Sequence, residues 1–262
     1  MAPLVLAALF LLPPRGFGVA LLAVIFVAAR EWSRLAAFSG KWQWLYQGGI
    51  VAFCSGLLFL PAAGFDRGWP ATLILVICGA SALFWLLVAP FWVGQRWPTT
   101  GKRAMVLAGW IVLIGAWAAL VELQSRSPWL VLAAMAIVWV ADTAAYFSGR
   151  AFGRRKLAPG ISPGKTWEGA LGAASAVTIY GFVLSPALPA VLAANYALLL
   201  VVLVAITAIG IIGDLFESLL KRQAGLKDSS SILPGHGGVL DRIDSLTSTL
   251  PLVALVWLGT VY

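Results

Sequence analysis

Long runs of apolar residues alternate with short polar segments along the whole chain. Two of the clearest runs cover residues 104–121 and 191–212. A membrane-spanning helix needs about 20 apolar residues in a row, whereas barrel strands alternate apolar and polar side chains over about 10 residues. The pattern therefore predicts an all-α, polytopic bundle of membrane helices.

The apolar runs define eight or nine predicted spans. They cover residues 2–12, 16–29, 44–61, 69–93, 104–123, 129–149, 168–185, 191–213 and 246–261. The count has two values because the first segment is short for a span and ends at Pro13 and Pro14, which disrupt a helix. No repeat or hydrophilic linker divides the chain, so we predict one membrane-embedded domain over residues 1–262.

The amino-acid composition also indicates that the chain is surrounded by lipid. Hydrophobic residues make up 61% of the 262 positions and charged residues only 11%, whereas a soluble domain carries about 25% charged residues. Backbone groups inside a bilayer must be hydrogen-bonded internally, which a helix achieves by itself. Cys54 and Cys78 lie within apolar runs and are interpreted as small buried hydrophobic residues.

Basic residues gather in alternate loops. Fifteen of the 18 lysines and arginines lie after the second, fourth, sixth and eighth predicted spans. Cytoplasmic loops collect Lys and Arg, so these four loops are predicted to face the cytoplasm. The net charge of +8 is then concentrated on one side, which suits anionic lipid headgroups or anionic substrates. For the first two loops, topology signalling alone is the simpler explanation.

Acidic residues are rare and clustered. Seven of the ten lie between positions 142 and 244: Asp142, Glu168, Asp214, Glu217, Asp228, Asp241 and Asp244. A carboxylate near the end of a membrane span is costly without a partner or water, so each is a functional hypothesis. The predicted site therefore lies mainly in residues 142–245.

The spacing of these acids places them on helix faces. Two sets follow the i, i+3, i+4, i+7 pattern of one face: Asp214, Glu217, Ser218 and Lys221, and then Asp241, Asp244, Ser245 and Ser248. Asp142 and Tyr146 form a shorter version. Mg²⁺ prefers carboxylate oxygens, with phosphate and water completing its shell. The alternative is that the acids pair with nearby Lys and Arg and only hold helices together.

Two glycine-containing loops have the composition of phosphate cradles. In the first, Ser162 and Pro163 precede Gly164, Lys165 and Thr166. It resembles a Walker A loop only partly, because Pro159 stands at the first glycine position and no strand is expected before it. A P-loop NTPase is therefore not expected, and a simple turn that begins the next span is the alternative.

The second loop, residues 234–244, holds the only histidine, His236. Gly237 and Gly238 allow close approach of a ligand to the backbone. The loop leads into the helix that carries Asp241, whose N-terminus favours anions. His236 is a candidate acid, base or phosphate donor, and a purely structural histidine is the alternative.

The segment 218–244 contains a dense set of mostly polar residues at fixed spacing: Ser218, Lys221, Arg222, Lys227, Asp228, Ser230, Leu233, His236, Asp241, Arg242 and Asp244. This set resembles the signature of the phosphatidate cytidylyltransferase (CDP-diacylglycerol synthase) family. The stretch from Asp142 and Tyr146 through Ser162 to Glu168 is also similar to that family.

The resemblance implies that CTP and phosphatidate give CDP-diacylglycerol and pyrophosphate, with one or more Mg²⁺ ions. We expect Asp214 and Asp241 to hold the metal, with Asp142, Glu217 and Asp244 as weaker candidates. Lys221 and His236 complete the expected catalytic set. The expected substrate-binding residues are Ser162, Gly164, Lys165, Thr166, Arg222, Lys227, Asp228, Gly237, Gly238 and Arg242.

The expected partners are CTP, phosphatidate and the lipid bilayer, without nucleic acid; a homodimer is left open. The expected location is a bacterial-type cytoplasmic membrane, with the site facing the cytoplasm. Three alternative functions compete with the expected cytidylyl transfer. A secondary transporter would place its acids near the midplane rather than at one face. A transferase with another activated alcohol or nucleotide shares the chemistry, and a non-catalytic scaffold leaves the glycine-rich loops unexplained.

Overall fold

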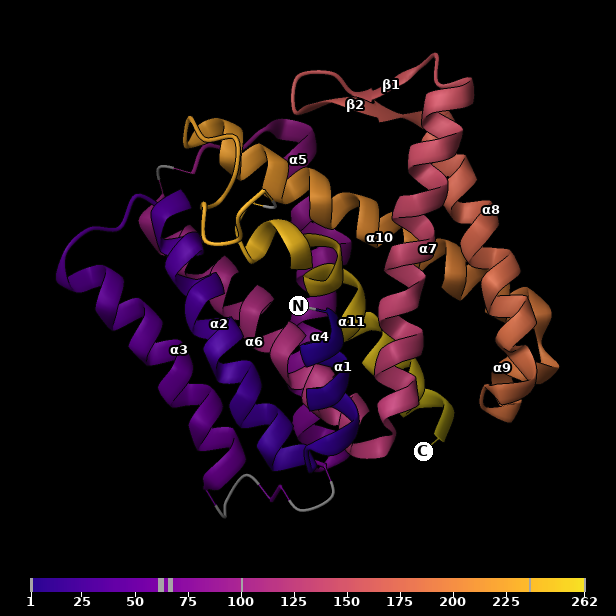
Figure 1. The fold of residues 1–262 in the computed structure, drawn as a ribbon, viewed down its shortest axis with the longest axis horizontal. Coiled ribbons are helices and arrows are strands. Elements are labelled where there is room, and N and C mark those ends of the chain that lie inside the picture. The colour runs from indigo at the N-terminus through magenta and orange to yellow at the C-terminus, as the bar shows by residue number, and fades with distance from the viewer. Residues whose placement is uncertain (1, 61–63, 66–67, 100, 236, 262) are drawn as a thin grey trace.

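The computed structural model describes residues 2–261 except 61–63, 66–67, 100 and 236, and shows a bundle of helices with one small hairpin (Figure 1). The first helices are α1 (Ala2–Leu11), α2 (Pro14–Leu35), α3 (Lys41–Phe59), α4 (Ala71–Leu83), a π-helical turn η2 (Phe84–Val88) and α5 (Ala89–Gln95). The central helices are α6 (Lys102–Arg126) and α7 (Pro128–Phe152). The hairpin of β1 (Lys156–Ala158) and β2 (Ser162–Thr166) follows. The last helices are α8 (Trp167–Leu184), a 3₁₀ turn η3 (Ser185–Ala187), α9 (Ala190–Ala194), α10 (Tyr196–Gln223) and α11 (Leu240–Val261).

The predicted all-α membrane fold is confirmed, but the number of spans differs. In the described part of the chain, seven helical segments are long and apolar enough to cross a membrane. Helix α1 has 10 residues, which is about 15 Å, half of the bilayer core. Helix α3 is 19 residues long but carries Lys41, Gln43 and Gln47, so it falls outside the seven. The protein is a multi-pass membrane protein.

Helix α10 starts later and ends later than the apolar run predicts. Asn195 ends the short helix α9 and caps α10, because its side chain accepts a hydrogen bond of 3.0 Å from the amide of Leu198. The 28 residues of α10 span about 42 Å, more than the bilayer core of about 30 Å. The end of this helix, with Asp214, Glu217 and Lys221, is thereby carried beyond the apolar middle of the bundle.

An aromatic cluster fixes the site-bearing end of α10. The ring of Phe216 is 1% exposed. Its centroid lies 5.6 Å from Phe84, 5.5 Å from Trp85, 5.5 Å from Trp92 and 6.3 Å from Trp32. Because Glu217 is the next residue, the packing of Phe216 sets the position of the neighbouring carboxylates.

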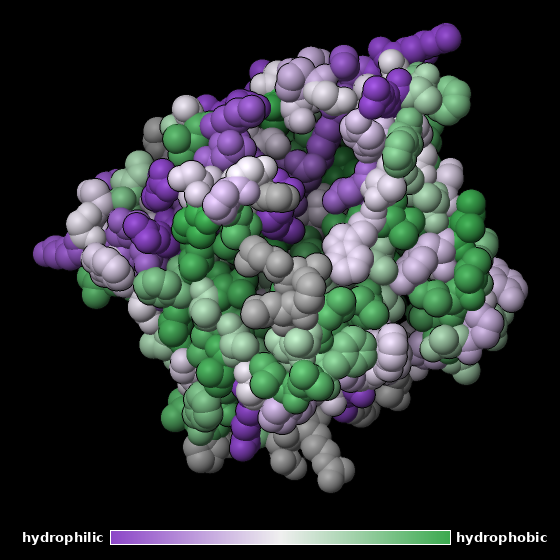
Figure 2. Space-filling view, viewed as in Figure 1, coloured by the Kyte–Doolittle hydropathy of each residue, from purple (hydrophilic) through white to green (hydrophobic). Residues whose placement is uncertain are grey.

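Polar groups gather at one end of the bundle. The hairpin, the end of α5 and the segment between α10 and α11 lie together at the top of Figure 1, opposite the C-terminal end of α3. Hydrophilic side chains cover that same end in Figure 2, whereas hydrophobic side chains dominate the middle. Three of the predicted basic loops therefore lie at one end of the bundle. This is expected, because basic loops follow every second predicted span and alternate loops lie on the same side of a membrane.

Candidate active site

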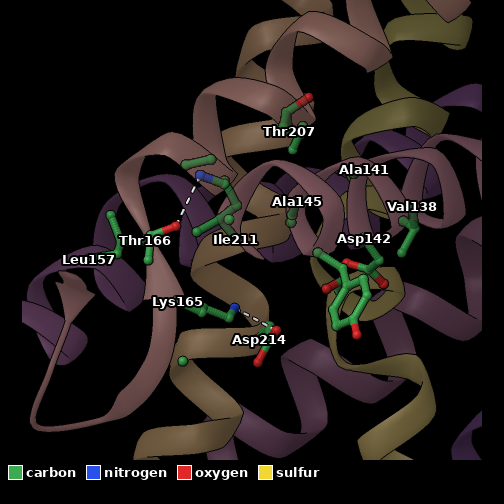
Figure 3. A pocket seen from close by; sticks show the side chains of 18 of the residues that line it. Val138, Ala141, Asp142, Ala145, Leu157, Lys165, Thr166, Thr207, Ile211 and Asp214 are labelled. Carbon is green, nitrogen blue, oxygen red and sulfur yellow. Dashed lines mark hydrogen bonds and ion pairs between the residues drawn. The ribbon is translucent and has the colours of Figure 1, made fainter. Parts of the chain in front are cut away.

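A cavity of about 560 Å³ opens between α7, β2, α8, α10 and α11. Asp142 from α7, Lys165 from β2 and Asp214 from α10 line its polar part. Lys165 points toward Asp214 (Figure 3), and its Nζ lies 2.5 Å from Oδ2 of Asp214. Three of the predicted residues, from three separate elements, thus meet in one cavity.

The hairpin delivers Lys165 to this cavity. Its strands pair antiparallel, with Lys156 opposite Thr166 and Ala158 opposite Ser162. Thr166 ends β2 and caps α8, since its Oγ1 accepts a hydrogen bond of 3.1 Å from the amide of Gly169. The prediction of a loop without a preceding strand is wrong here, because residues 162–166 form the second strand of this hairpin.

Two further contacts hold the hairpin in place. Glu168 at the start of α8 accepts hydrogen bonds from the amides of Arg154 and Arg155, at 3.1 to 3.2 Å. Arg222 near the end of α10 donates to the carbonyl of Ile161 at 3.4 Å. Both ends of the hairpin are therefore tied to helices that line the cavity.

A second ion-paired group lies between α10 and α11. Nζ of Lys221 lies 2.6 Å from Oδ1 of Asp241 and 3.2 Å from Oε2 of Glu217. Oδ2 of Asp241 accepts hydrogen bonds from the amide and hydroxyl of Ser229, both 2.9 Å, and from the amide of Gly238 at 2.7 Å. The polar faces predicted on these two helices do meet.

Asp244 links the two groups electrostatically. It lies close enough to both Asp214 and Glu217 to interact with each of them electrostatically. Oε1 of Glu217 is buried and has no hydrogen-bond partner among the described residues. The described part of the chain contains no set of three or more His, Cys, Asp or Glu residues placed to hold a metal alone. Mg²⁺ commonly uses one or two carboxylates plus substrate phosphates, so these residues fit part of such a shell, and the magnesium assignment stays a prediction.

Comparison with known proteins decides the family. The model of the cytidylyltransferase family matches residues 1–258. The chain belongs to this family. Phosphatidate cytidylyltransferase of Pseudomonas aeruginosa is 40% identical over 273 residues, which cover 98% of this chain and 93% of the relative.

Two further relatives share the same name. Phosphatidate cytidylyltransferase of Haemophilus influenzae is 36% identical over 266 residues, covering 94% of this chain and 91% of the relative. Phosphatidate cytidylyltransferase of Brucella suis is 37% identical over 250 residues, which cover 92% of this chain and 83% of the relative. The likeness to the cytidylyltransferase family therefore extends over nearly the whole chain and is not confined to the signature segment.

The other predicted residues of this cytidylyltransferase-family chain are distributed around the two groups. Gly164 and Thr166 line the cavity, while Ser162 opens β2. Several predicted binding residues are exposed at the polar end of the bundle: Arg222, Lys227, Asp228 and Arg242. Gly237 has a positive φ of 81°, as expected for a glycine that allows a tight turn. His236 lies outside the described residues.

Two residues of the site are absent from the predicted set. Arg150 lines the cavity and donates to the hydroxyl of Tyr146 at 3.0 Å. Glu31, near the end of α2, is 0% exposed and accepts hydrogen bonds from the amides of Val239 and Leu240 at the start of α11. The only available signal for Glu31 is that it is one of ten acids and stands beside Arg30 at the end of a predicted span.

Proposed function

We propose that the chain transfers the cytidylyl group of CTP to phosphatidate, giving CDP-diacylglycerol and pyrophosphate for phospholipid synthesis. The observation that carries this proposal is the division of the cavity. Lys165, Asp214 and Asp142 line its polar part, and residues such as Ile137 and Ile206 line the rest. A lipid with a phosphate headgroup and apolar chains has the same division, and the relatives named above support the same activity.

The proposed reaction needs no side-chain nucleophile. A phosphate oxygen of phosphatidate forms a bond to the α-phosphorus of CTP. The bond from that phosphorus to the oxygen that bridges to the β-phosphorus breaks, and this oxygen leaves with the electron pair as part of pyrophosphate. Such chemistry depends mainly on positioning and on neutralising spread negative charge. In this proposal Lys165, Lys221 and Arg222 supply positive charge to the phosphates.

The carboxylates have a complementary role in the proposal. Asp214 and Asp241 would hold Mg²⁺, with Asp142, Glu217 and Asp244 as further candidates. A bound Mg²⁺ would polarise phosphate oxygens and offset their charge. In the structure each of the two principal carboxylates pairs with a lysine. Lys165 and Lys221 are flexible point charges, and each can turn to a substrate phosphate when its carboxylate is otherwise neutralised.

We also propose that this end of the bundle faces the cytoplasm of a bacterial cytoplasmic membrane. Cytoplasmic loops are enriched in Lys and Arg, and the loops at this end carry most of these residues. CTP is a soluble anion, so a site at this end would receive CTP from the water and phosphatidate from the bilayer.

The test uses purified protein in lipid nanodiscs with α-labelled CTP, phosphatidate and Mg²⁺. The expected product is labelled CDP-diacylglycerol, which disappears when phosphatidate is omitted or EDTA is added, and returns with excess Mg²⁺. Wild-type protein that forms no labelled lipid contradicts the proposal. Solute flux through the same protein in liposomes would then favour the transporter.

A further inference from the structure

Glu31 is a fully buried carboxylate with four hydrogen-bond donors around it. Its Oε1 accepts from the hydroxyl of Ser230 at 2.5 Å and the amide of Val239 at 3.0 Å. Its Oε2 accepts from the amide of Leu240 at 2.7 Å and lies 3.1 Å from the hydroxyl of Ser229. A buried carboxylate is costly unless it is hydrogen-bonded in this way, so the environment is built around the charged group.

The four donors belong to the two ends of one loop. Ser229 and Ser230 precede residues 231–238, and Val239 and Leu240 follow them; we call these four residues the neck. Leu240 is the first residue of α11, so its N–H has no acceptor within its own helix. Glu31 therefore closes the neck and caps α11 from another helix, where a negative charge is favourable.

The neck also holds Asp241. Oδ2 of Asp241 accepts from Ser229 and from the amide of Gly238, and the hydroxyl of Ser229 lies within reach of both carboxylates. The packing leaves no spare space, since a Cβ on Gly238 would lie 2.0 Å from Oγ of Ser229 and 2.6 Å from Oε1 of Glu31. A shift of Glu31 must therefore move the groups that orient Asp241.

We propose that Glu31 is a positioning residue, which fixes the neck and thereby orients Asp241 toward Lys221 and shapes the loop for the phosphates of CTP. This inference rests on the proposed function. Glu31 is not among the described residues that line the cavity, so it acts through the neck rather than on substrate. Its loss should affect CTP more than phosphatidate, whose apolar chains have their place along the cavity wall.

The test compares Glu31→Gln with wild type in nanodiscs. A glutamine places an NH₂ group where one carboxylate oxygen stood, and this group faces a backbone N–H that cannot turn away. We expect KM for CTP to rise about tenfold or more, in the range found when groups that orient a site are removed. KM for phosphatidate should stay close to that of wild type.

Glu122→Gln is the matched control. Glu122 is also a buried glutamate, 4% exposed, and accepts from the amide of Trp69 at 2.9 Å and from Arg126 at 2.8 Å. It lies near the end of α6 that is far from the predicted site. A purely structural substitution reduces the fraction of folded enzyme and so lowers kcat without changing KM, which is the result expected for Glu122→Gln.

A second measurement does not depend on activity. Hydrogen exchange of the amides in residues 229–240 should be faster in Glu31→Gln than in wild type and unchanged in Glu122→Gln. An unchanged KM for CTP together with wild-type exchange in this segment would overturn the inference. If the wild-type protein makes no CDP-lipid, the proposed function fails separately, and wild-type exchange in Glu31→Gln then overturns the positioning of the neck while faster exchange supports it.

Discussion

The carboxylates of Asp214 and Asp241 differ in the number of hydrogen bonds that they accept. Asp241 accepts hydrogen bonds from Lys221 and from the amides of Ser229 and Gly238, and it shares the single hydroxyl donor of Ser229 with Glu31. Asp214 pairs with Lys165 and accepts a longer bond of 3.3 Å from Ser218, and it lines the cavity. Asp241 therefore also holds local structure, whereas the contacts of Asp214 leave more of its carboxylate available to a ligand.

The two aspartates should respond differently to substitution. Asp214→Asn is expected to abolish CDP-lipid formation with almost no change in stability. Asp241→Asn should abolish turnover and also lower stability by about 2 kcal/mol, because buried donors lose their acceptor. Activity assays and thermal unfolding in the same detergent measure the two effects. An immunoblot of the membrane fraction measures how much of each variant is present. Turnover near the wild-type level in Asp241→Asn would count against the metal-binding role proposed for Asp241.

Gly238 should not tolerate a side chain. Gly238→Ala would drive a methyl group into Ser229 and Glu31, so we expect lower stability and a higher KM for CTP. Gly79→Ala on α4 is the control, because no atom lies within 4 Å of its Cβ position and alanine favours a helix by about 1 kcal/mol over glycine. Equal kinetics and melting temperatures for the two variants would show that the neck has room to adapt.

At the scale of elements, close contact between α7 and α8 sets the base of the hairpin. A Cβ on Gly172 would lie 2.0 Å from Oγ and 2.5 Å from Cβ of Ser148. Small residues allow helices in membranes to approach closely. Because β2 runs directly into α8, this contact helps to determine where Lys165 meets Asp214.

The α7–α8 contact can be tested by a paired substitution. Gly172→Ala is expected to lower stability by about 1 to 3 kcal/mol through overpacking. Adding Ser148→Gly removes both clashing atoms and should recover much of that loss, less about 1 kcal/mol for a glycine in a helix. Thermal unfolding of the two single variants and the double variant measures the coupling. Additive effects of the two substitutions would contradict the contact.

At the scale of the whole molecule, alternating basic loops predict one orientation in the membrane. The loop between α2 and α3 carries exposed Ser39 at the basic end, and Ala194 is exposed at the end of α9. Cys54 and Cys78 are both 0% exposed, so an introduced cysteine would be the main target of a water-soluble maleimide.

Labelling of sealed vesicles tests this orientation. Ser39→Cys should react with an impermeant maleimide in inverted vesicles, and Ala194→Cys in right-side-out vesicles. Adding detergent should make both accessible and serves as the control for reactivity. The opposite pattern would place the predicted site outside the cytoplasm and would remove its supply of CTP.

The helices were predictable because a long apolar run in lipid has few alternatives to a helix. The span count was less predictable, since the 10 residues of α1 and the polar residues of α3 place both near the limits of a span. The hairpin is not predictable in this way, because β1 has only three residues and β2, which contains Pro163 and Gly164, lacks the alternating β-branched pattern of a strand.

Parts of the site could also be predicted. The spacing of Asp214, Glu217 and Lys221 follows directly from helix geometry, and Asp241 does meet Lys221. The pairing of Lys165 with Asp214 depends on how the hairpin folds, which spacing does not encode. Glu31 lies about 200 positions before its partners, so only the tertiary fold brings them together.

The contact between Glu31 and the neck has a consequence for biosynthesis. The ribosome makes α2 early, and the 198 to 209 residues that separate Glu31 from its donors take roughly 10 to 40 s to translate. During that interval the carboxylate must remain hydrated at the membrane surface. The end of α2 therefore completes its hydrogen bonds only when α11 has docked.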